Sequence, residues 1–262
     1  MAEKSDHALA GRTAIVTGGM RGIGWAVAQG FAGRGANVAI VDRDVADAPE
    51  VAAARRRIEA AGAALLYLQA DVTNEAEVRS FVARVADRFG TVDALVNNVG
   101  VGAPPKPIEQ VSLEEWTKVV NQNILSTFLC SREAAPHMKQ QRRGTIVNMS
   151  SQAGRSKSEI GNLPYACAKA GVLGFTRQLA NELAPFGIRV NAVAPGLTLS
   201  ERVEVRLLAM EETQRNEFLA VVPLGRLGDP HEIADAILFL STDASSYITG
   251  ATLDVNGGRF MM

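Results

Sequence analysis

The chain has 262 residues, 47% of them hydrophobic, and a formal net charge of −1 at pH 7. A chain of this length can bury a substantial core, and its near-neutral charge gives no electrostatic reason to expect nucleic acid or an acidic membrane as a partner. The amino-terminal residues lack the pattern of a signal peptide, no apolar run approaches the ~18 residues of a membrane span, and the two cysteines have no metal-site spacing. We therefore expect a cytoplasmic protein with no metal site and no membrane or nucleic-acid partner.

Short β-branched runs alternate with longer amphipathic stretches over most of the chain. In chain order, the expected strands are Thr13–Thr17, Asn37–Val41, Leu65–Gln69, Ala94–Asn97, Thr145–Met149, Arg189–Val193 and Thr252–Val255. Clear helical stretches between them are Ile23–Arg34, Glu75–Phe89 and Ile124–Gln141. This alternation predicts βαβ units and a parallel sheet covered by helices on both faces. No low-complexity linker interrupts the pattern, so we expect residues 1–262 to form a single domain.

Two helix starts and one insertion are marked in the chain. Ser112-Leu113-Glu114-Glu115 predicts a capping box, and Asp229-Pro230-His231-Glu232 combines a cap, a first-turn proline and a reciprocal acid. Residues 197–222 are rich in charge and methionine and predict a helical flap over a substrate site. Its candidate apolar lining, which helix packing would explain equally well, is Leu197, Leu199, Val203, Leu207, Leu208 and Met210.

The first expected strand ends in a glycine-rich turn, Thr17-Gly18-Gly19-Met20-Arg21-Gly22-Ile23-Gly24. Glycine permits a tight turn and a close approach of the backbone to a ligand. The following helix start offers N–H groups and a positive dipole end, which suit a diphosphate. Asp42 ends the second strand 18 residues after Gly24, where an acid can bond the hydroxyls of an adenosine ribose. The turn lacks the Gly-Lys-Ser/Thr of a Walker A loop, so we expect a dinucleotide site.

Tyr165 and Lys169 are four residues apart, which places them on one face of a helix. The ammonium favours the phenolate, so we expect the pKa of Tyr165 to fall from about 10 toward the range of an acid–base catalyst. Such a pair also arises by chance on solvated helix faces. Here Ser151, after the fifth strand, and the run Asn97–Gly100, after the fourth, fall at compatible places.

Further positions complete one pattern along the chain. Its members are Thr17, Gly18, Gly22, Gly24, Asp71, Asn97, Asn98, Val99, Gly100, Asn123, Ser151, Tyr165, Lys169, Pro195 and Gly196. This set resembles the classical short-chain dehydrogenase/reductase family over nearly the whole chain, from about Leu9 to Gly258. The resemblance implies a doubly wound Rossmann-type α/β sheet of about seven parallel strands, a nicotinamide cofactor at the carboxyl ends of the strands, and a homotetramer.

The resemblance also implies a role for each catalytic residue. Tyr165 would be the acid–base, Lys169 would lower the pKa of the tyrosine and bond the nicotinamide ribose, and Ser151 would hold the substrate oxygen. Asn123, chosen over Asn121 because it precedes Phe128 by five residues, would anchor a water that links Lys169 to solvent.

The cofactor site implied in the same way extends from the first turn to the sixth strand. Its residues are Gly18, Met20, Arg21, Gly22, Ile23, Gly24, Asp42, Arg43, Asp71, Val72, Asn98, Val99, Gly100, Tyr165, Lys169, Pro195, Gly196, Thr198 and Ser200. Asp71 and Val72 would flank the adenine, and Asn97 would support the core of the site. Thr198 and Ser200 are alternatives for the hydroxyl that contacts the nicotinamide amide. NAD is the expected cofactor because of Asp42, with NADP as the alternative.

Three features bear on specificity. Val99 stands where the family usually has alanine, and Ser151 and Tyr165 are 14 residues apart where 13 is common. The connecting loop is polar, which suits a hydroxylated or anionic substrate contacted by Gln152, Arg155 or Asn162, whereas Lys157 and Glu159 read as solvated. The final residues, Phe260-Met261-Met262, suggest a tail buried at or near a subunit contact, or against its own subunit.

We expect an NAD(H)-preferring oxidoreductase that interconverts a small secondary alcohol and a ketone. An NADP(H)-dependent carbonyl reductase of the same family is the alternative. A short-chain epimerase or dehydratase would use the cofactor transiently, and a cofactor-sensing protein would be expected to carry a broken Ser–Tyr–Lys set. The set is intact here, which argues against a sensor.

Overall fold

The structure, a computed structural model, describes residues 8–44, 48–158, 161–199, 203–204 and 210–261. Its seven parallel strands form one sheet in the order β3-β2-β1-β4-β5-β6-β7. The strands are β1 (Thr13–Thr17), β2 (Asn37–Asp42), β3 (Leu65–Gln69), β4 (Ala94–Asn97), β5 (Gly144–Met149), β6 (Ile188–Pro195) and β7 (Thr252–Val255). All seven expected strands are therefore confirmed, and the largest shift is at β6, which ends at Pro195 rather than Val193.

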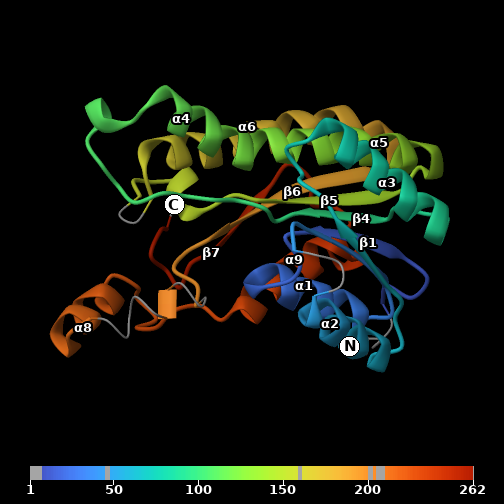
Figure 1. Cartoon of the computed structure of the whole chain (residues 1–262), viewed down its shortest axis with the longest axis horizontal. Helices are drawn as coiled ribbons and strands as arrows, with labels where there is room; N and C mark the ends of the chain where they lie inside the picture. The colour runs from blue at the N-terminus through green and yellow to red at the C-terminus, as the bar shows by residue number, and fades with distance from the viewer. Residues whose placement is uncertain (1–7, 45–47, 159–160, 200–202, 205–209, 262) are drawn as a thin grey trace.

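Helices cover both faces of this sheet, as expected. They are α1 (Gly22–Ala32), α2 (Pro49–Ala60), α3 (Glu75–Phe89), α4 (Leu113–Val120), α5 (Ser126–Gln141), α6 (Leu163–Leu183), α8 (Glu212–Ala220) and α9 (Pro230–Ser241). Short turns lie at η1 (Ile108–Gln110), η2 (Asn121–Leu125), η3 (Gln152–Gly154), η4 (Ala184–Phe186) and η5 (Asp243–Ser245). Figure 1 shows α3, α5 and α6 on one face of the sheet and α1, α2 and α9 on the other.

Two apolar cores follow from the alternation of side chains along the strands. In β1, Val16 packs with Phe31 of α1 in one core, while its neighbour Ile15 packs with Leu95 and Met138 in the other. Strands β1 to β6 contribute to both cores, which is why they are largely apolar rather than alternating, whereas the edge strand β7 contributes only Val255, to the first core.

The helix expected at Ile124–Gln141 is longer and less regular than the sequence predicts. Helix α4 continues through the π-helical turn η2 into α5, and residues on both sides of each junction are in the right-handed helical region. Such a turn inserts an extra residue in the helical repeat and often marks a functional site. Here it contains Asn123, whose side chain is fully buried.

One of the two expected capping boxes is complete. The Asp229 and Glu232 side chains accept hydrogen bonds from each other's backbone at the start of α9. At α4, Ser112 Oγ accepts from the Glu115 N–H at 3.1 Å, but the Glu115 carboxylate is used elsewhere, because it accepts from Asn162 Nδ2 at 2.8 Å. The prediction of a capping box at α4 is therefore right for Ser112 and wrong for Glu115. The Glu115 carboxylate instead joins α4 to the start of α6.

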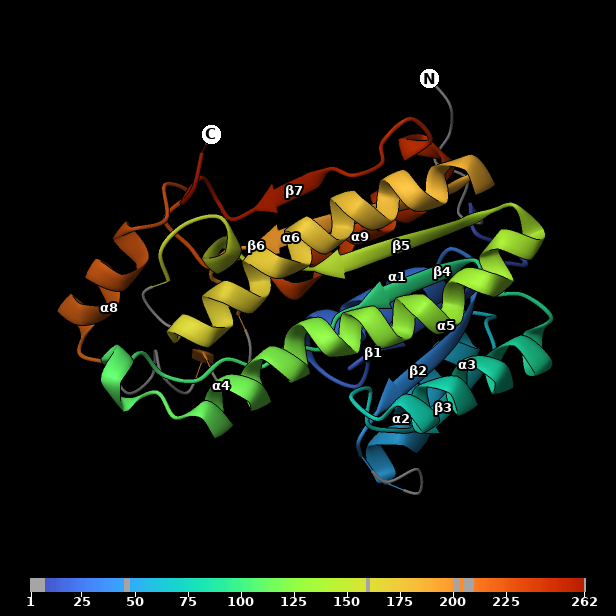
Figure 2. The same ribbon diagram turned by 90° about the horizontal axis from the view of Figure 1, so that it is seen from above.

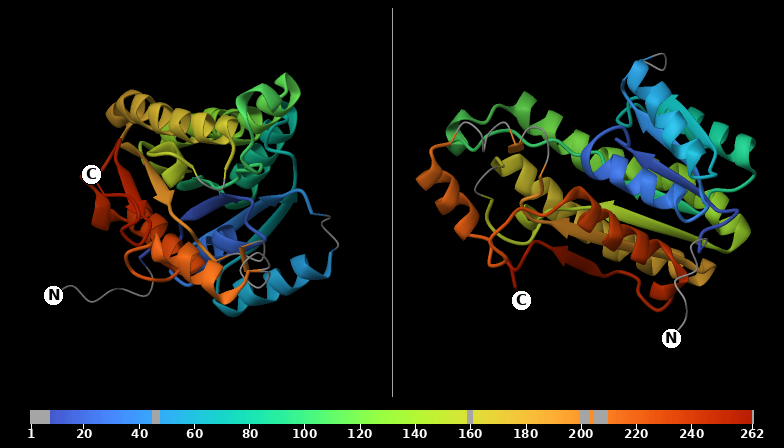
Figure 3. Two further views of the ribbon diagram at one scale, coloured as in Figure 1. Left: turned by 90° about the vertical axis from the view of Figure 1, so that its left-hand side faces the viewer. Right: turned by 90° about the horizontal axis from the view of Figure 1, so that it is seen from below.

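The strand arrows of β5, β6 and β7 in Figure 2 point toward the end of the molecule where α4 and α8 lie. Figure 3 shows the same end from the side and from below. The expected flap at 197–222 is described in part, with α8 as its helix, and residues 200–202 and 205–209 lie outside the described residues. Within the described part of the chain, no helix is both long enough and apolar enough to cross a membrane.

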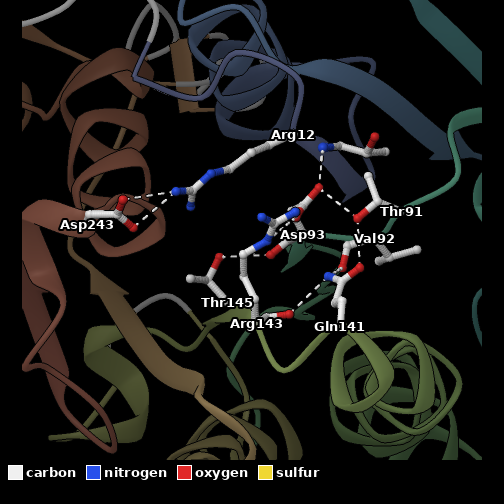
Figure 4. A network of polar contacts seen from close by, with 9 residues as sticks. Arg12, Thr91, Val92, Asp93, Gln141, Arg143, Thr145 and Asp243 are labelled. Carbon is white, nitrogen blue, oxygen red and sulfur yellow. Dashed lines mark hydrogen bonds and ion pairs between the residues drawn. The ribbon is translucent and has the colours of Figure 1, made fainter.

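The amino ends of the central strands are joined by the buried carboxylate of Asp93 (Figure 4). It accepts from the Thr13 N–H at 2.9 Å, from Thr91 Oγ1 at 3.0 Å and from Arg143 Nε at 2.9 Å. The Asp93 side chain is only 1% exposed, whereas that of Arg143 is 55% exposed. A carboxylate buried in this way is stabilised by charge-assisted hydrogen bonds from three segments of the chain.

Candidate active site

The carboxyl ends of the strands open into a cavity of about 460 Å³ between the glycine-rich turn and the Ser151–Tyr165 pair. The predicted residues that line it are Gly18, Arg21, Ile23, Gly24, Asp42, Arg43, Asp71, Val72, Asn98, Val99, Gly100, Ser151, Tyr165, Lys169, Pro195, Gly196 and Thr198. Of the other predicted residues, Met20, Gly22 and Asn123 are not among the lining residues, and Ser200 lies outside the described residues. The fold therefore brings together positions from the first strand to the sixth.

Some lining residues were missed by sequence reasoning. They are Val41, Ala70, Thr73, Val101, Gln122, Met149 and Ser150. Each is within two residues of a predicted site residue. These residues could therefore have been identified from the sequence by their position next to a site residue at the end of a strand or helix. Of the candidate flap residues, Leu197, Leu199 and Val203 line the cavity, while Leu207 and Leu208 lie outside the described residues.

The glycine-rich turn has the shape that a dinucleotide diphosphate requires. Gly18 has a φ of +64°, and a Cβ on Gly24 would lie 2.1 Å from the Gly18 carbonyl oxygen. Helix α1 begins at Gly22 with no side-chain cap from Arg21 and no acidic residue in its first turn. The first N–H groups and the positive dipole end therefore lie at the cavity with no acid in the first turn of the helix, which fits a bound diphosphate.

The Asp42 carboxylate is fixed at the adenosine end of the cavity by two backbone hydrogen bonds. Its Oδ2 accepts from the Met20 N–H at 3.1 Å, and its Oδ1 accepts from the Arg43 N–H at 2.8 Å. The Arg21 guanidinium pairs with Asp44 at 2.7 Å. One of the two arginines that could receive a 2′-phosphate is thus held by an acid, and Arg43 is the other.

Asn98 ties the loop after β4 to the glycine-rich turn. Its Nδ2 donates to the carbonyl oxygens of Thr17 and Gly18, both at 3.0 Å, and its backbone N–H donates to Thr17 Oγ1. Asn97 lies on the face of the sheet that α5 covers, where its Nδ2 donates to Ser131 Oγ at 3.0 Å and to Asn148 Oδ1 at 2.9 Å. The two neighbouring asparagines therefore support the site from different sides.

Tyr165 lies in a narrow cradle at the start of α6. A Cβ added to Gly102 would approach its ring to 3.3 Å, and one added to Gly161 would approach to 2.7 Å. Asn162 is the N-cap of α6, and its Oδ1 accepts from the Tyr165 N–H at 3.2 Å. The ring is therefore held between two glycines, because any larger residue at Gly161 would collide with it.

The expectation that the pKa of Tyr165 falls is wrong for this structure. Burial raises the pKa of the phenol above its ordinary value, and a hydrogen bond with Ser151 acts in the opposite direction. Lys169 is on the same helix face, with its Nζ 5.7 Å from the centre of the ring. Its own burial lowers the pKa of the ammonium to about 7, so the charged and neutral forms of Lys169 are both populated near neutral pH.

Lys169 and Asn123 meet behind Gly100. Lys169 Nζ donates to the Met149 carbonyl oxygen at 2.7 Å. A Cβ on Gly100 would lie 2.6 Å from this Nζ and 2.8 Å from Asn123 Oδ1. Asn123 Nδ2 donates to the carbonyl oxygens of Val101 and Val119, whereas its Oδ1 is buried without a hydrogen-bond partner. An unpaired buried acceptor beside an ammonium is the arrangement expected where a water or a ligand hydroxyl completes a polar chain.

The candidate substrate contacts in the loop after Ser151 differ in whether they line a cavity or make contacts within the protein. Gln152 lines a second cavity beside Ser151 and Tyr165. Arg155 is used elsewhere, because it pairs with Asp254 at 3.1 Å, and Asn162 is buried as the cap of α6. Arg155 and Asn162 therefore serve the structure of the site, and a contact of either with substrate stays a prediction.

Known proteins resemble this chain in sequence and in fold. A family model described as enoyl-(acyl carrier protein) reductase matches residues 18–259. The 3-oxoacyl-[acyl-carrier-protein] reductase FabG of Vibrio cholerae is 39% identical over 254 residues, covering 97% of this chain and 99% of that protein. The protein of the same name from Staphylococcus aureus is 38% identical over 251 residues, covering 95% and 98%.

Among solved structures, the 3-oxoacyl-[acyl-carrier protein] reductase of Brucella melitensis aligns with a TM-score of 0.89 and 35% identity. That alignment covers 99% of this chain and 95% of the other. The sheet order and the matched sequence lead to the same conclusion. The chain is an oxidoreductase that belongs to the classical short-chain dehydrogenase/reductase family, whose members use NAD(H) or NADP(H).

Proposed function

We propose that the chain interconverts a small secondary alcohol and a ketone, with NAD(H) preferred over NADP(H). The observation that carries this proposal is the meeting of Ser151, Tyr165 and Lys169 in the same cavity as the glycine-rich turn and Asp42. Acid–base groups and a dinucleotide-shaped cradle in one cavity are what hydride transfer to a carbonyl requires.

The residues present fit a nicotinamide dinucleotide. The turn from Gly18 to Gly24 would hold the diphosphate, and Asp42 would hold the adenosine ribose. The strand ends would hold the adenine and the nicotinamide through Asp71, Val72, Asn98, Val99, Gly100, Pro195, Gly196 and Thr198. When bound, the cofactor supplies the hydride for reduction of the ketone or accepts it from the alcohol.

The protein's own residues handle the oxygen and the proton. Ser151 Oγ accepts from the Ala153 N–H at 3.1 Å, and its hydroxyl, which hydrogen-bonds Tyr165 here, would turn its hydrogen to the substrate oxygen. In the reduction, Tyr165 donates its phenolic proton to that oxygen as negative charge develops there. A phenol with a raised pKa is protonated at neutral pH and ready to donate.

Lys169 restores the proton. Its lowered pKa, near 7, allows the amine to exchange a proton at neutral pH, and the buried Asn123 Oδ1 offers the next acceptor beyond it. Tyr165 and Lys169 would therefore form the proton path, and Asn123 would position a water through which Lys169 regains its proton from solvent.

A second candidate activity is reduction of a 3-oxoacyl group carried on an acyl carrier protein. The names of the relatives at 38–39% identity favour it. Both activities use the same acid–base set and differ in what fills the substrate side of the cavity.

The test is absorbance at 340 nm with NADH and NADPH against a panel of small ketones and a 3-oxoacyl carrier-protein thioester. We expect net oxidation of NADH with at least one small ketone. Turnover of the thioester alone would support the second candidate. Substrate conversion without net change at 340 nm would indicate an epimerase or a dehydratase instead.

A further inference from the structure

The short turn η3 begins directly at the catalytic serine. Ser151 is its N-cap, with Oγ accepting from the Ala153 N–H at 3.1 Å and the carbonyl oxygen accepting from the Gly154 N–H at 2.9 Å. Arg155 closes the turn, since its N–H donates to the Gln152 carbonyl oxygen at 2.9 Å. The direction of the Ser151 hydroxyl therefore depends on where the whole turn lies.

One side of this turn packs against the helix that carries Lys169. A Cβ added to Gly154 would lie 2.6 Å from the Lys169 carbonyl oxygen and 2.8 Å from the Ala170 nitrogen, so a larger residue would displace the turn. Ser150 Oγ donates to the same Lys169 carbonyl oxygen at 2.8 Å. The turn has no room to move toward α6, and its position is decided by what holds it from the other side.

Arg155 holds the other side of the turn. Its guanidinium pairs with Asp254 of β7 at 3.1 Å and lies 5.3 Å from the centre of the Phe260 ring. Phe260 is itself positioned by Asn256, whose Nδ2 donates to the Phe260 carbonyl oxygen at 3.0 Å. We call Arg155, Asp254 and Phe260 the Arg155 cluster. This cluster joins the turn after Ser151 to the last strand and to the carboxy-terminal residues.

Stability alone does not explain the Arg155 cluster. Arg155 Nε and Asp254 Oδ1 are buried and have no hydrogen-bond partner among the described residues. A partly buried ion pair with incomplete hydrogen bonding is weak evidence for stability, because taking two charges out of water costs about as much as their attraction returns. None of the three residues lines the cavity of about 460 Å³ that contains Ser151 and Tyr165, so any effect on the reaction passes through the turn.

We propose that Asp254 and Phe260 are positioning residues for the reaction, because they fix Arg155 and through the turn η3 direct the Ser151 hydroxyl at the substrate oxygen. The inference rests on the proposed function, in which Ser151 holds that oxygen. A carboxylate at the edge of a guanidinium and an aromatic ring on its face together limit its rotation. Loss of either contact lets the turn shift, and a shift of about 1 Å at a reacting group can lower turnover by about 10²-fold.

The experiment is a double-mutant cycle with Ser151. Asp254→Asn keeps the shape of the side chain and removes its charge, and Phe260→Leu removes the ring. Each should lower kcat for the best ketone of the panel by about tenfold in the otherwise unaltered chain, but by less than about twofold in Ser151→Ala, where the hydroxyl to be positioned is missing. Phe260→Tyr, which keeps the ring, should retain the kcat of the unaltered chain, and NADH affinity should be unchanged in all of them.

Asp243→Asn is the matched control, because it removes a carboxylate that pairs with Arg12 at 3.0 Å on the turn after α9, and it should leave kcat unchanged. An equal fold loss with and without the Ser151 hydroxyl would mean that the Arg155 cluster only stabilises the fold, and would overturn the proposal. Normal kcat in both Asp254→Asn and Phe260→Leu would overturn it as well. Thermal melting identifies a variant that fails to fold, and the other variant then carries the comparison.

The inference and the proposed function fail separately. If ketones are reduced but the fold losses are equal in both backgrounds, the function stands and the positioning role is wrong. If no ketone is reduced, hydrogen exchange of the NADH-loaded protein still tests the cluster, because the Ala153 and Gly154 N–H groups both donate to Ser151. Faster exchange of these two groups in Asp254→Asn than in Asp243→Asn would support it, and equal exchange would reject it.

Discussion

Asn162 Oδ1 accepts a hydrogen bond from the backbone N–H of Tyr165 at 3.2 Å, so the residue that caps α6 also fixes the first turn carrying the phenol. Asn162 is itself held on two further sides. Its Nδ2 donates to Glu115 Oε1 at 2.8 Å, and its backbone N–H donates to the Ala103 carbonyl oxygen at 2.9 Å. The position of Tyr165 therefore depends on a contact between α4 and α6.

Asn162→Ala should lower kcat by about tenfold or more in addition to lowering the unfolding free energy by about 1 kcal/mol, the usual effect of losing a helix cap. Asn74→Ala is the matched control, because Asn74 caps α3 through hydrogen bonds from the Ala76 and Glu77 N–H groups. The measurements are kcat with a saturating ketone and unfolding in urea. Equal kcat in the two variants at equal loss of stability would contradict a positioning role for Asn162.

Tyr165→Phe keeps the ring in its glycine cradle and removes the transferable proton. We expect kcat to fall by about 10²-fold or more, the scale of general acid–base catalysis, with NADH affinity little changed. Lys169→Ala should impair both quantities, since the resemblance assigns it to the nicotinamide ribose as well. Turnover and NADH fluorescence titration measure the two effects. Near-normal turnover of Tyr165→Phe across the pH range would show that another group supplies the proton.

Lys169 should also make stability depend on pH. Burial lowers its pKa to about 7 from the ordinary 10.5, so between these values the unfolded chain binds the proton and the folded chain does not. Unfolding free energy attributable to this group therefore rises with pH from about 7, by up to about 1.4 kcal/mol per pH unit. Below pH 7 both states are protonated, and the contribution no longer changes.

The measurement is urea unfolding at several pH values from 6 to 9.5. Lys169→Met should lose the upward slope, whereas Lys118→Met, which removes an exposed lysine of α4, should keep it. A slope in Lys169→Met identical to that of the unaltered chain would mean that Lys169 retains its proton in the folded state.

Asp42 should set the preference for NAD. A 2′-phosphate would meet its carboxylate at the end of β2, a repulsion of a few kcal/mol in a partly desolvated site. We predict that kcat/KM with NAD exceeds that with NADP by at least about tenfold, or roughly 1.4 kcal/mol. Asp42→Ala should narrow or invert the ratio and leave Arg43 to receive the phosphate.

Asp42→Asn removes the negative charge of Asp42 but keeps its hydrogen bond to the glycine-rich turn, because the amide oxygen can still accept from the Met20 N–H. It therefore tests the charge separately from the support of the turn. It should change the cofactor ratio in the same direction as Asp42→Ala while better preserving the turn. An unaltered protein that prefers NADP would show that the arginines outweigh Asp42.

The buried Asp93 should be important for stability. Asp93→Ala leaves the Thr13 N–H without its acceptor, whereas the Arg143 side chain that remains is exposed to solvent, so we expect a loss of about 1–3 kcal/mol. Asp243→Ala removes the ion pair between Arg12 and Asp243, and the side chain of Asp243 is 82% exposed. This substitution should lower the unfolding free energy by less than about 1 kcal/mol. Urea unfolding of the two variants makes the comparison, and similar losses would show that the Asp93 network contributes little.

The sequence was sufficient for the sheet and for which residues share the cavity, because both follow from local patterns. Apolar β-branched runs mark strands, and residues at the carboxyl ends of parallel strands meet at one edge. The sequence did not predict the π-helical turn at Asn123, since the residue types in that turn are equally compatible with an ordinary α-helix. The predicted fall in the pKa of Tyr165 was wrong. The spacing of the two residues shows that Lys169 is near Tyr165, but it does not show that both side chains are buried, which disfavours the charged form of each.

Side chains with two possible partners were also hard to assign. Arg155 and Lys157 are two residues apart in one polar loop, yet Arg155 pairs with Asp254 while Lys157 lines the second cavity beside Ser151. Glu115 fitted a capping box by spacing, but Asn162, 47 positions further along the chain, competes for it. Such choices depend on long-range contacts that no local pattern contains.

The Asp93 network and the catalytic cavity lie at opposite ends of the same strands. The four residues of β4 lie between Asp93 and Asn98, which are therefore roughly 17 Å apart along the strand. At such a separation the effects of substitutions are expected to add rather than couple. Protein engineering can therefore treat the molecule as two independent targets, with thermal tolerance selected at the amino edge and substrate range at the carboxyl edge.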